Sequence, residues 1–517
     1  MSKNKTISIT VLQTADIHGQ IDPHQEFFVE NGKIVFRKRG GLAHIKTLFE
    51  KEKKANHDRT IIVDGGDMIQ GSGYAALSEG KIFSDIVRNM GYDLLIPGNW
   101  EVVYGKDVML NVMKNYQTQV IVQNMKDEKS GKNLFPPYWV KEIEGIRLGF
   151  IGVNDPDIPE RQNPKFSKGI AFNDLDDGVK KLVTKLKQEE KTDVIFLITH
   201  IGIFKQVALS NKFIAKDVDY ILGNDTHERI RKPIEGKYAK VTEPGAFGSF
   251  VGKLTLNFEE GKFVSDDYEL IEVDPEKYPA DKELQKIIDK AKKPYQKELE
   301  KVAGTTTTPL YRYIPVQTPM DNFITDAMRW KTGADISLSN GFRFGYPIVP
   351  EDDKPAPISK NDIWCMLPVN EKVKTGEVTG KQLKEWLEKE ANNVFAKNSA
   401  ERFGGWLVRF SGMQVELDTS KPKGRRILSI KVGNKPIEKD DVYTVSACIR
   451  EGDPKTTLCR LKNAKKISVK DYTVHDVLEE YLKEKSPIEP ELDNRAKAVD
   501  LKKISFTTVP GTNYKFR

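Results

Sequence analysis

The stretch 194-VIFLITHIG-202 decides the fold, because an apolar run of strand length ends in a threonine, a histidine and a glycine. A continuous apolar run of this length is typical of a strand buried on both faces. Similar apolar runs, each followed by a polar loop, occur in 7-ISITVLQTADIHGQ-20, 60-TIIVDGGD-67, 94-LLIPGNWE-101 and 220-YILGNDTH-227. Amphipathic stretches such as 40-GGLAHIKTLFEKEKK-54 lie between them. This alternation predicts an α/β protein with a layered sheet.

Length and composition bound the classes that the chain can belong to. Its 517 residues, 38% hydrophobic and 30% charged, are too many for one core and predict two to four globular domains. A fibre, a peptide hormone and a single binding module are therefore excluded. The net charge is +7, and residues of both signs are interspersed along the chain. Nucleic acid is therefore not specially implied, and an anionic substrate is only weakly favoured.

The sequence pattern changes along the chain and predicts the domain boundaries. We expect a first α/β domain at residues 1–270 and a charged linker helix at 271–310, kinked or broken near Pro294. A second α/β domain is expected at 311–505, and the aromatic, basic tail 506–517 is expected to drape over the surface.

Apolar segments and cysteines give limited information on the cellular compartment. No apolar run approaches the ~20 residues of a membrane helix, and the first residues lack the apolar core of a signal peptide. The protein is expected to be cytoplasmic if the chain is complete, or periplasmic if a leader was removed. Among three cysteines, Cys448 and Cys459 are close enough in sequence to form a disulfide or to remain free thiols.

Five loops that follow the apolar runs carry side chains able to bind metal ions. They contain Asp16, His18, Asp67, Asn99, His200, Asp225 and His227. Singly, such residues often cap helices or fix turns, but three of the chain's seven histidines fall in these loops. Because open α/β sheets bind ligands at the carboxyl ends of their strands, the loops are expected to converge on two divalent ions. A ligand set without thiolate favours Mn²⁺, with Fe, Mg²⁺ or Zn²⁺ possible.

The order D-x-H, G-G-D, G-N-x-E, T-H-x-G and G-x-x-T-H resembles the calcineurin-like metallophosphoesterases, in particular the two-domain branch that contains the 5′-nucleotidases. Within that branch the chain is similar to the SoxB-type thiosulfohydrolases of the sulfur-oxidising Sox system. That similarity is carried by DGGDMIQGS, GNWEVVYG, NGFRFGYP, MLPVNEKVKTGEVTGKQLKEWLE, GGWLVRFSGM and REGDPKTTLCR. The resemblance implies a four-layer αββα domain joined by a linker helix to a 5′-nucleotidase-type α/β domain.

The resemblance also implies a role for each candidate ligand. One ion is expected to be bound by Asp16, His18 and His227, with Asp67 as the bridge, and the other by Asn99, His200 and Asp225. The chain departs from the family at two positions. Trp100 stands where nucleotidases have a histidine that stabilises the phosphoryl transition state, and Asp225 stands where a metal-binding histidine is usual.

Substrate recognition is expected from the second domain. Arg343 and Arg450 are candidates for binding a sulfonate, since guanidinium groups match tetrahedral oxyanions; a structural salt bridge is the alternative for each. Asn340, Gly341 and Asp453 are further candidates for substrate contact, and Gly341 is expected to allow a close backbone approach or simply to form a turn. We expect Trp100 to form a wall of the site. His44, His57 and His475 are interpreted as ordinary residues, and the role of His24 is open.

The leading hypothesis is a dimetal hydrolase that releases sulfate from a cysteine S-thiosulfonate on a SoxYZ-type carrier protein, working as a monomer in the periplasm without membrane insertion or nucleic acid. The ions would activate water and offset the charge of the substrate. The alternatives are a 5′-nucleotidase or other phosphomonoesterase, and an inactive metal-binding scaffold.

Overall fold

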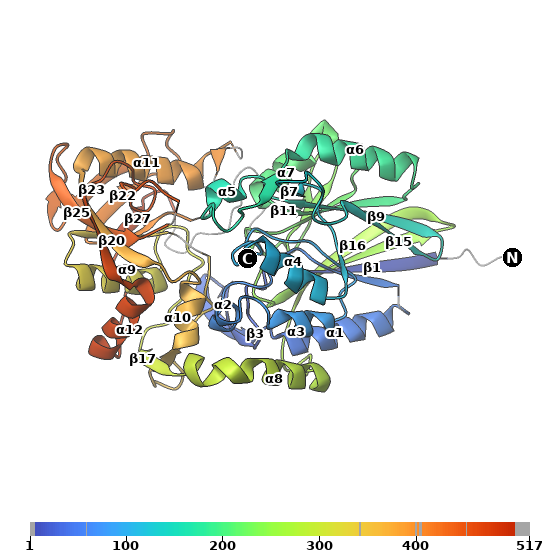
Figure 1. The fold of residues 1–517 in the computed structure, drawn as a ribbon, viewed down its shortest axis with the longest axis horizontal. Coiled ribbons are helices and arrows are strands. Elements are labelled where there is room, and N and C mark those ends of the chain that lie inside the picture. Colours follow the sequence, from blue (N-terminus) through green and yellow to red (C-terminus); the bar gives the residue numbers. More distant parts are fainter. Residues whose placement is uncertain are drawn as a thin grey trace.

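The computed structural model describes residues 6–57, 59–340, 343–398, 401–402, 406–450 and 452–501. The predicted tail 506–517 and Gly341 lie outside these residues. Two six-stranded sheets form the first domain, and the second domain packs against the carboxyl-terminal ends of their parallel strands (Figure 1).

The first sheet has the strand order β16-β15-β1-β4-β5-β6. Its parallel strands are β1 (Thr6–Thr14), β4 (Thr60–Asp64), β5 (Leu94–Leu95) and β6 (Gln119–Val120). The antiparallel strands β15 (Phe250–Glu259) and β16 (Lys262–Glu272) complete one edge. β1, β4 and β5 are thereby neighbours, which brings the loops after them together.

The second sheet has the order β13-β14-β12-β11-β9-β8. Its parallel strands are β9 (Ile146–Asn154), β11 (Val194–His200), β12 (Tyr220–Gly223) and β14 (Lys240–Thr242). The edges are β8 (Tyr138–Ile143) and β13 (Ile234–Glu235), both antiparallel to their neighbours. β11 is central and buried along its whole length, as its continuous apolar sequence predicts.

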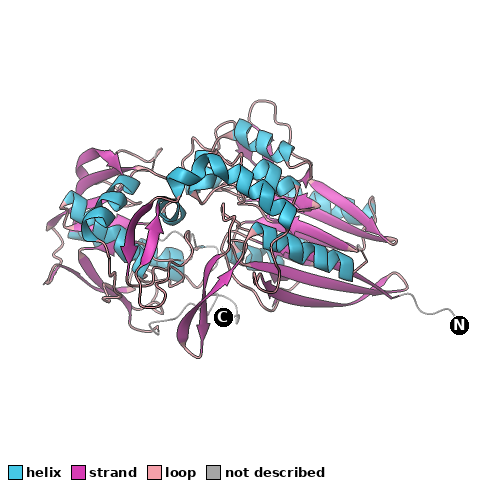
Figure 2. Cartoon of the chain, turned by 90° about the horizontal axis from the view of Figure 1, so that it is seen from below, coloured by secondary structure: helices cyan, strands magenta, loops and turns pink. Residues whose placement is uncertain are grey.

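The two sheets pack face to face over an apolar core in which Phe196 stacks between Phe150 and Tyr220, with ring centroids 4.8 and 5.4 Å away. Helices α1 (Leu42–Ala55), α2 (Gly73–Leu77), α3 (Phe83–Arg88) and α4 (Lys106–Asn115) cover the outer face of the first sheet. Helices α6 (Leu175–Gln188) and α7 (Ile203–Ser210) cover the second. The predicted four-layer αββα arrangement is confirmed (Figure 2).

The connection between the domains is an unbroken helix, so of the predicted kink or break at Pro294 the break is absent. Helix α8 (Lys282–Leu299) continues through Pro294, and Asp281 caps it by accepting a hydrogen bond from the Leu284 amide at 2.8 Å. Its buried Leu284 and Ile288 belong to the core beneath the first sheet. A proline removes only one donor from a helix, and packing against the domain compensates for that loss. The helix therefore extends the outer layer of the first domain.

The second domain contains a five-stranded sheet, β21-β18-β25-β20-β26, and a four-stranded sheet, β24-β23-β22-β27. The strands are β18 (Ile336–Ser339), β20 (Lys372–Thr379), β21 (Arg409–Ser411), β22 (Met413–Leu417), β23 (Ile427–Val432), β24 (Lys435–Pro436), β25 (Val442–Cys448), β26 (Lys465–Thr473) and β27 (Ala496–Ala498). Helices α9 (Pro319–Thr332), α10 (Lys360–Met366), α11 (Gly380–Phe395) and α12 (Val474–Lys485) pack on them, and β17 (Val302–Thr306) pairs with β19 (Ala356–Ser359). Cys448 and Cys459 are free thiols.

Four short elements complete the first domain: the strand pair β7 (Met125–Asp127) and β10 (Ile170–Phe172), helix α5 (Ile158–Arg161) and the 3₁₀ turn Phe213–Ala215. None of the helices in the described parts of the chain is long and apolar enough to cross a membrane.

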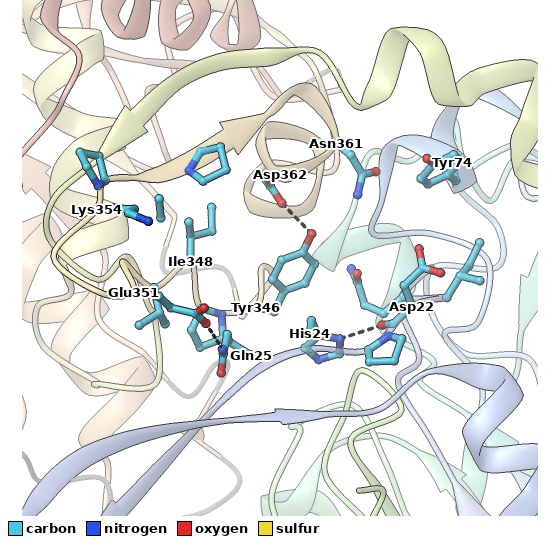
Figure 3. A pocket seen from close by; sticks show the side chains of 18 of the residues that line it. Asp22, His24, Gln25, Tyr74, Tyr346, Ile348, Glu351, Lys354, Asn361 and Asp362 are labelled. Atoms are coloured by element: carbon cyan, nitrogen blue, oxygen red, sulfur yellow. Dashed lines mark hydrogen bonds between the residues drawn. The ribbon is translucent and has the colours of Figure 1, made fainter. Parts of the chain in front are cut away.

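The domain junction is aromatic and explains His24. The hairpin of β2 (His24–Glu30) and β3 (Lys33–Arg39) places Phe27 against Tyr313, with ring centroids 5.5 Å apart. His24 stacks on Tyr346 at 4.9 Å, and the Tyr346 hydroxyl donates to Asp362 at 2.6 Å. His24, Tyr346 and Asp362 line a pocket of about 530 Å³ between the domains (Figure 3). His24 is therefore a junction residue.

We expect Phe196→Ala to destabilise the first domain by about 3–5 kcal/mol, because the substitution leaves a cavity between two stacked rings. Urea unfolding followed by circular dichroism measures the change. The control Phe213→Ala removes a ring that is 68% exposed and should change the free energy of unfolding by less than about 0.5 kcal/mol. A loss below about 1 kcal/mol for Phe196→Ala would show that this stack does not hold the sheets together.

Candidate metal centre

The structure brings the side chains of all seven predicted ligands together. They follow β1, β4, β5, β11 and β12, whose carboxyl ends point toward the second domain (Figure 1). Asp16, Asp67 and His200 are at most 1% exposed, and the other four are also largely buried. The convergence predicted from parallel strand ends is what the structure shows.

The first group of candidate ligands is Asp16, His18 and His227. The Nε2 atoms of the two histidines face each other at 3.0 Å. Asp16 Oδ1 lies 3.9 Å from His18 Nε2 and 3.8 Å from His227 Nε2. Three donor atoms thus surround one point, as the ligands of a single cation do.

The second group contains Asp67, His200 and Asn99. His200 Nε2 lies 3.1 Å from Asp67 Oδ2, and one end of the Asn99 amide lies 3.0 Å from the same nitrogen and 3.2 Å from Asp67 Oδ2. Asp67 Oδ2 is also 3.6 Å from His18 Nε2, so it faces both groups, as a bridging ligand must. Asp16 Oδ1 lies 3.7 Å from His200 Nε2 and is equally central.

The backbone of these loops is strained. Asp16, His18, Asp67, Asp225 and His227 have φ angles of 51°, 50°, 60°, 87° and 61°, in the left-handed region that side chains with a Cβ rarely adopt. Such conformations persist only where the surroundings determine them, and they concentrate at functional sites. The strain therefore points to a function for this cluster.

Glu101 fixes two of the loops in place. Its carboxylate accepts hydrogen bonds from the amides of Asp67 at 2.8 Å, Met68 at 2.7 Å and Gly98 at 2.6 Å. Burial raises the pKa of Glu101 to about 7, and Asp67 adds to that effect. Gly98 has no Cβ because one would lie 2.2 Å from Asp67 Oδ1. Glu101 thus sets the position of the predicted bridge and of the loop that carries Asn99.

The electrostatics of the cluster suit divalent cations. Burial lowers the pKa of His18 and His227, so their imidazoles are neutral and can act as ligands. Burial opposes the charged form of His200, but Asp67 and Asp16 raise its pKa well above the usual value. Burial, together with Asp67, also raises the pKa of Asp16. Cations would compensate these buried carboxylates, and the oxygen and imidazole donors fit two such ions.

Asp225 makes contacts that the sequence did not indicate. Its Oδ1 accepts from Arg161 Nη2 at 2.8 Å, and its amide donates to Asp16 Oδ2 at 3.1 Å. Burial opposes the negative charge of Asp225, but Arg161 and His200 overcome that effect and lower its pKa to about 2. Asp225 is thus a carboxylate at the edge of the cluster, 4.0 Å from His200 Nε2.

Trp100 and the second domain close one side of the site. The Trp100 amide donates to Asp67 Oδ1 at 2.7 Å, and its ring meets that of Phe344 edge-on at 5.6 Å. Phe344 in turn contacts His18 at 4.5 Å between ring centroids. Arg343 Nη1 donates to the carbonyl oxygen of Thr226, between Asp225 and His227. Trp100 forms a wall of the site, as the sequence predicts, and Arg343 lies beside the loop of Asp225 and His227. The sequence did not indicate the role of Phe344.

The remaining predicted substrate residues are engaged with protein partners. Arg450 donates to Asp453 Oδ1 at 2.9 and 2.6 Å and to the carbonyl oxygen of Glu160 at 2.9 Å. Asn340 Oδ1 accepts from Arg460 Nη1 at 2.7 Å. The salt bridge considered as the alternative for Arg450 is therefore present.

Comparison with known proteins agrees with this architecture. Residues 302–447 match the model of the 5′-nucleotidase C-terminal domain. The chain is 23% identical to the trifunctional nucleotide phosphoesterase YfkN of Bacillus subtilis, covering 95% of this chain and 35% of that protein. It is also 23% identical to a 5′-nucleotidase of Vibrio parahaemolyticus, with 94% and 90% covered. The chain spans about a third to nine tenths of these relatives.

Two solved structures have the same two-domain fold. The sulfate thiohydrolase SoxB of Thermus thermophilus superposes with a TM-score of 0.84 at 19% identity, covering 97% of this chain and 98% of that one. A 5′-nucleotidase precursor of Thermus thermophilus superposes with a TM-score of 0.81 at 22% identity, covering 96% and 100%.

Fold and comparisons agree on a two-domain architecture. The chain has the fold of the 5′-nucleotidase family, with a calcineurin-like phosphoesterase domain followed by a 5′-nucleotidase C-terminal domain. The predicted fold class is confirmed.

We expect Asp67→Asn to weaken the binding of both metal ions by roughly tenfold or more, because one carboxylate faces both ligand groups. Asp225→Ala should weaken mainly one ion, since Asp225 lies at the edge of the cluster. Metal titration of the chelator-treated chain measures both affinities. Equal loss of a single ion in the two variants would contradict Asp67 as the bridge.

Proposed function

We propose that the protein is a dimetal hydrolase, with Mn²⁺ as the favoured metal, that releases sulfate from a cysteine S-thiosulfonate on a small carrier protein of the SoxYZ type. The observation that carries the proposal is the position of Trp100. It follows the candidate ligand Asn99, and its ring closes the site against Phe344. An indole offers no proton that it can exchange near neutral pH, so this position suits a leaving group that needs no general acid.

Several residues are placed to handle an anionic substrate. Arg343 donates to the Thr226 carbonyl oxygen, in the loop between Asp225 and His227, so its guanidinium lies beside two candidate ligands. Its guanidinium can bind the oxygens of a sulfonate, and the rings of Trp100 and Phe344 exclude water from the side opposite the ligands. When bound, the two ions would supply Lewis acidity and lower the pKa of water. The residues that would hold them are the seven ligands described above.

The proposed reaction balances without an oxidant or reductant. The oxygen of one water molecule bonds to the sulfonate sulfur, and the bond between the two sulfurs breaks. The carrier's outer sulfur leaves with the electron pair as a persulfide anion, and sulfate and two protons are released. A persulfide has low basicity, so the step does not depend on protonation of the leaving group. This agrees with the absence of an acid at Trp100.

Hydrolysis of a nucleotide is the second candidate, and Asn99 favours it. The chain keeps the amide at the position where the phosphoesterase pattern G-N-x-E has one, and its amide lies among the ligands. A phosphomonoester offers the same tetrahedral anion to Arg343. It differs in its alkoxide leaving group, which is far more basic and benefits from a proton donor.

We expect the Mn²⁺-loaded enzyme to release sulfate from a peptide whose glycine-flanked cysteine carries a thiosulfonate, and to hydrolyse nucleotides much more slowly. Trp100→His should then leave nucleotide turnover low. Trp139→His provides a matched control, because Trp139 packs on Phe150 in the core of the first domain. Sulfate and phosphate release are measured on the same preparations.

The opposite result identifies a phosphatase. If Trp100→His raises nucleotide turnover by the ~10²–10⁴-fold that a positioned proton donor contributes, and no form releases sulfate, the sulfur assignment is wrong.

A further inference from the structure

One short segment contacts two candidate ligands of the same ion. Helix α5 ends at Arg161, whose Nη2 donates to Asp225 Oδ1 at 2.8 Å. The next residue is Gln162. Its Nε2 lies 2.6 Å from the end of the Asn99 side-chain amide that does not face the other candidate ligands. In the amide orientation that satisfies both side chains, Gln162 Nε2 donates to the Asn99 side-chain oxygen. Two consecutive side chains therefore support Asn99 and Asp225.

Arg161 is itself held between two carboxylates. Its Nη1 donates to Asp155 Oδ2 at 2.5 Å, and Asp155 is fully buried. The other oxygen of Asp155 accepts from Lys205 at 3.0 Å, and Lys205 also pairs with Asp157 at 2.7 Å. Asp157 is 48% exposed and solvated, so the buried Asp155 is compensated jointly by Lys205 and Arg161, and Arg161 is the cation that pairs with Asp225.

The fold also makes room for a carboxylate at this place. Gly202, the residue before α7, has φ +82°. A Cβ there would lie 2.9 Å from Asp225 Oδ2 and 3.1 Å from Thr226 Cγ2. Gly202 thus leaves space for the Asp225 side chain while Arg161 holds it from the opposite oxygen.

We propose that Arg161 is a positioning residue of the metal centre: it holds Asp225 in place and offsets the third carboxylate of the ligand set, so that Asp225 and Arg161 act as one electrically neutral unit. This inference rests on the dimetal centre of the proposed function. The ligand set contains Asp16, Asp67 and Asp225, and Arg161 cancels one of these three charges. Removing only one member of the pair unbalances the site.

The proposal predicts strong coupling between the two residues. Asp225→His keeps a side chain that can bind metal but leaves the Arg161 charge unopposed beside the cation, so the affinity for the second Mn²⁺ should fall at least tenfold. In the Arg161→Gln background the same substitution leaves neither an unopposed guanidinium nor an unopposed carboxylate, so it should not cause that loss. The double variant should therefore bind the second ion within about threefold of the wild type.

Calorimetric titration of the full, chelator-treated chain with Mn²⁺ tests this, with elemental analysis for the number of ions bound. Circular dichroism verifies that each variant folds. Arg147→Gln is the matched control, because Arg147 is also shared by two carboxylates, Glu142 and Glu190, at the opposite end of β9. It should leave both affinities unchanged.

The outcomes separate this inference from the proposed function. Coupling of at least tenfold supports the neutral unit. In a chain that binds two ions, a double variant that binds the second ion as weakly as Asp225→His overturns it, since a purely structural role of Arg161 would lower stability without restoring that affinity. A wild type that binds fewer than two ions overturns the dimetal function and this inference together. If Arg161→Gln does not fold, Arg161→Lys keeps the charge, and Asp225→His must then still weaken the second ion; no weakening would overturn the proposal.

Discussion

The buried carboxylates of Asp16 and Asp67 are the constraint on which the structure of the first domain depends. Two like charges that are almost completely removed from water are strongly unfavourable unless positive charge and hydrogen bonds compensate them. The chain supplies three imidazoles, backbone amides and the Trp100 amide, all within a few ångströms. Cations would complete that compensation. Burial opposes the charged form of His200, but Asp67 and Asp16 raise its pKa, so this imidazole shares in the compensation.

Positioning these charges requires backbone that is unfavourable in isolation. Buried groups that are not themselves candidate ligands hold the strained loops in place. Glu101 joins two loops, and Phe344 arrives from the second domain to cover His18. The first domain thus supplies the ligands, while the second supplies a wall and a guanidinium. Hydrophobic packing at the junction, such as Phe27 on Tyr313, holds these parts in register.

The fold could be predicted from the sequence because its signals are local. Each apolar run that ends in Asp, Asn or His is a parallel strand followed by a ligand loop, and the order of the strands brings those loops together. Arg161, Gln162 and Phe344 could not be found in this way. Their contacts depend on tertiary packing of segments with no periodic pattern, and an arginine at the end of a four-residue helix looks like any exposed cation. The predicted break at Pro294 is absent for a related reason, since packing on the first domain outweighs one lost hydrogen bond.

The two unusual residues of the site change its chemistry in different ways. In the proposed function, Trp100 stands in place of a proton donor and adds an apolar wall, which would limit the reaction to leaving groups of low basicity or to slow turnover. Asp225 adds negative charge, which by itself would bind the ion more tightly and make bound water less acidic. The ion pair with Arg161 opposes the effect on bound water, because the guanidinium offsets part of the carboxylate charge near the cation. A site that gives up a general acid depends more on an activated water molecule. The contact between Arg161 and Asp225 therefore compensates for what Trp100 removes.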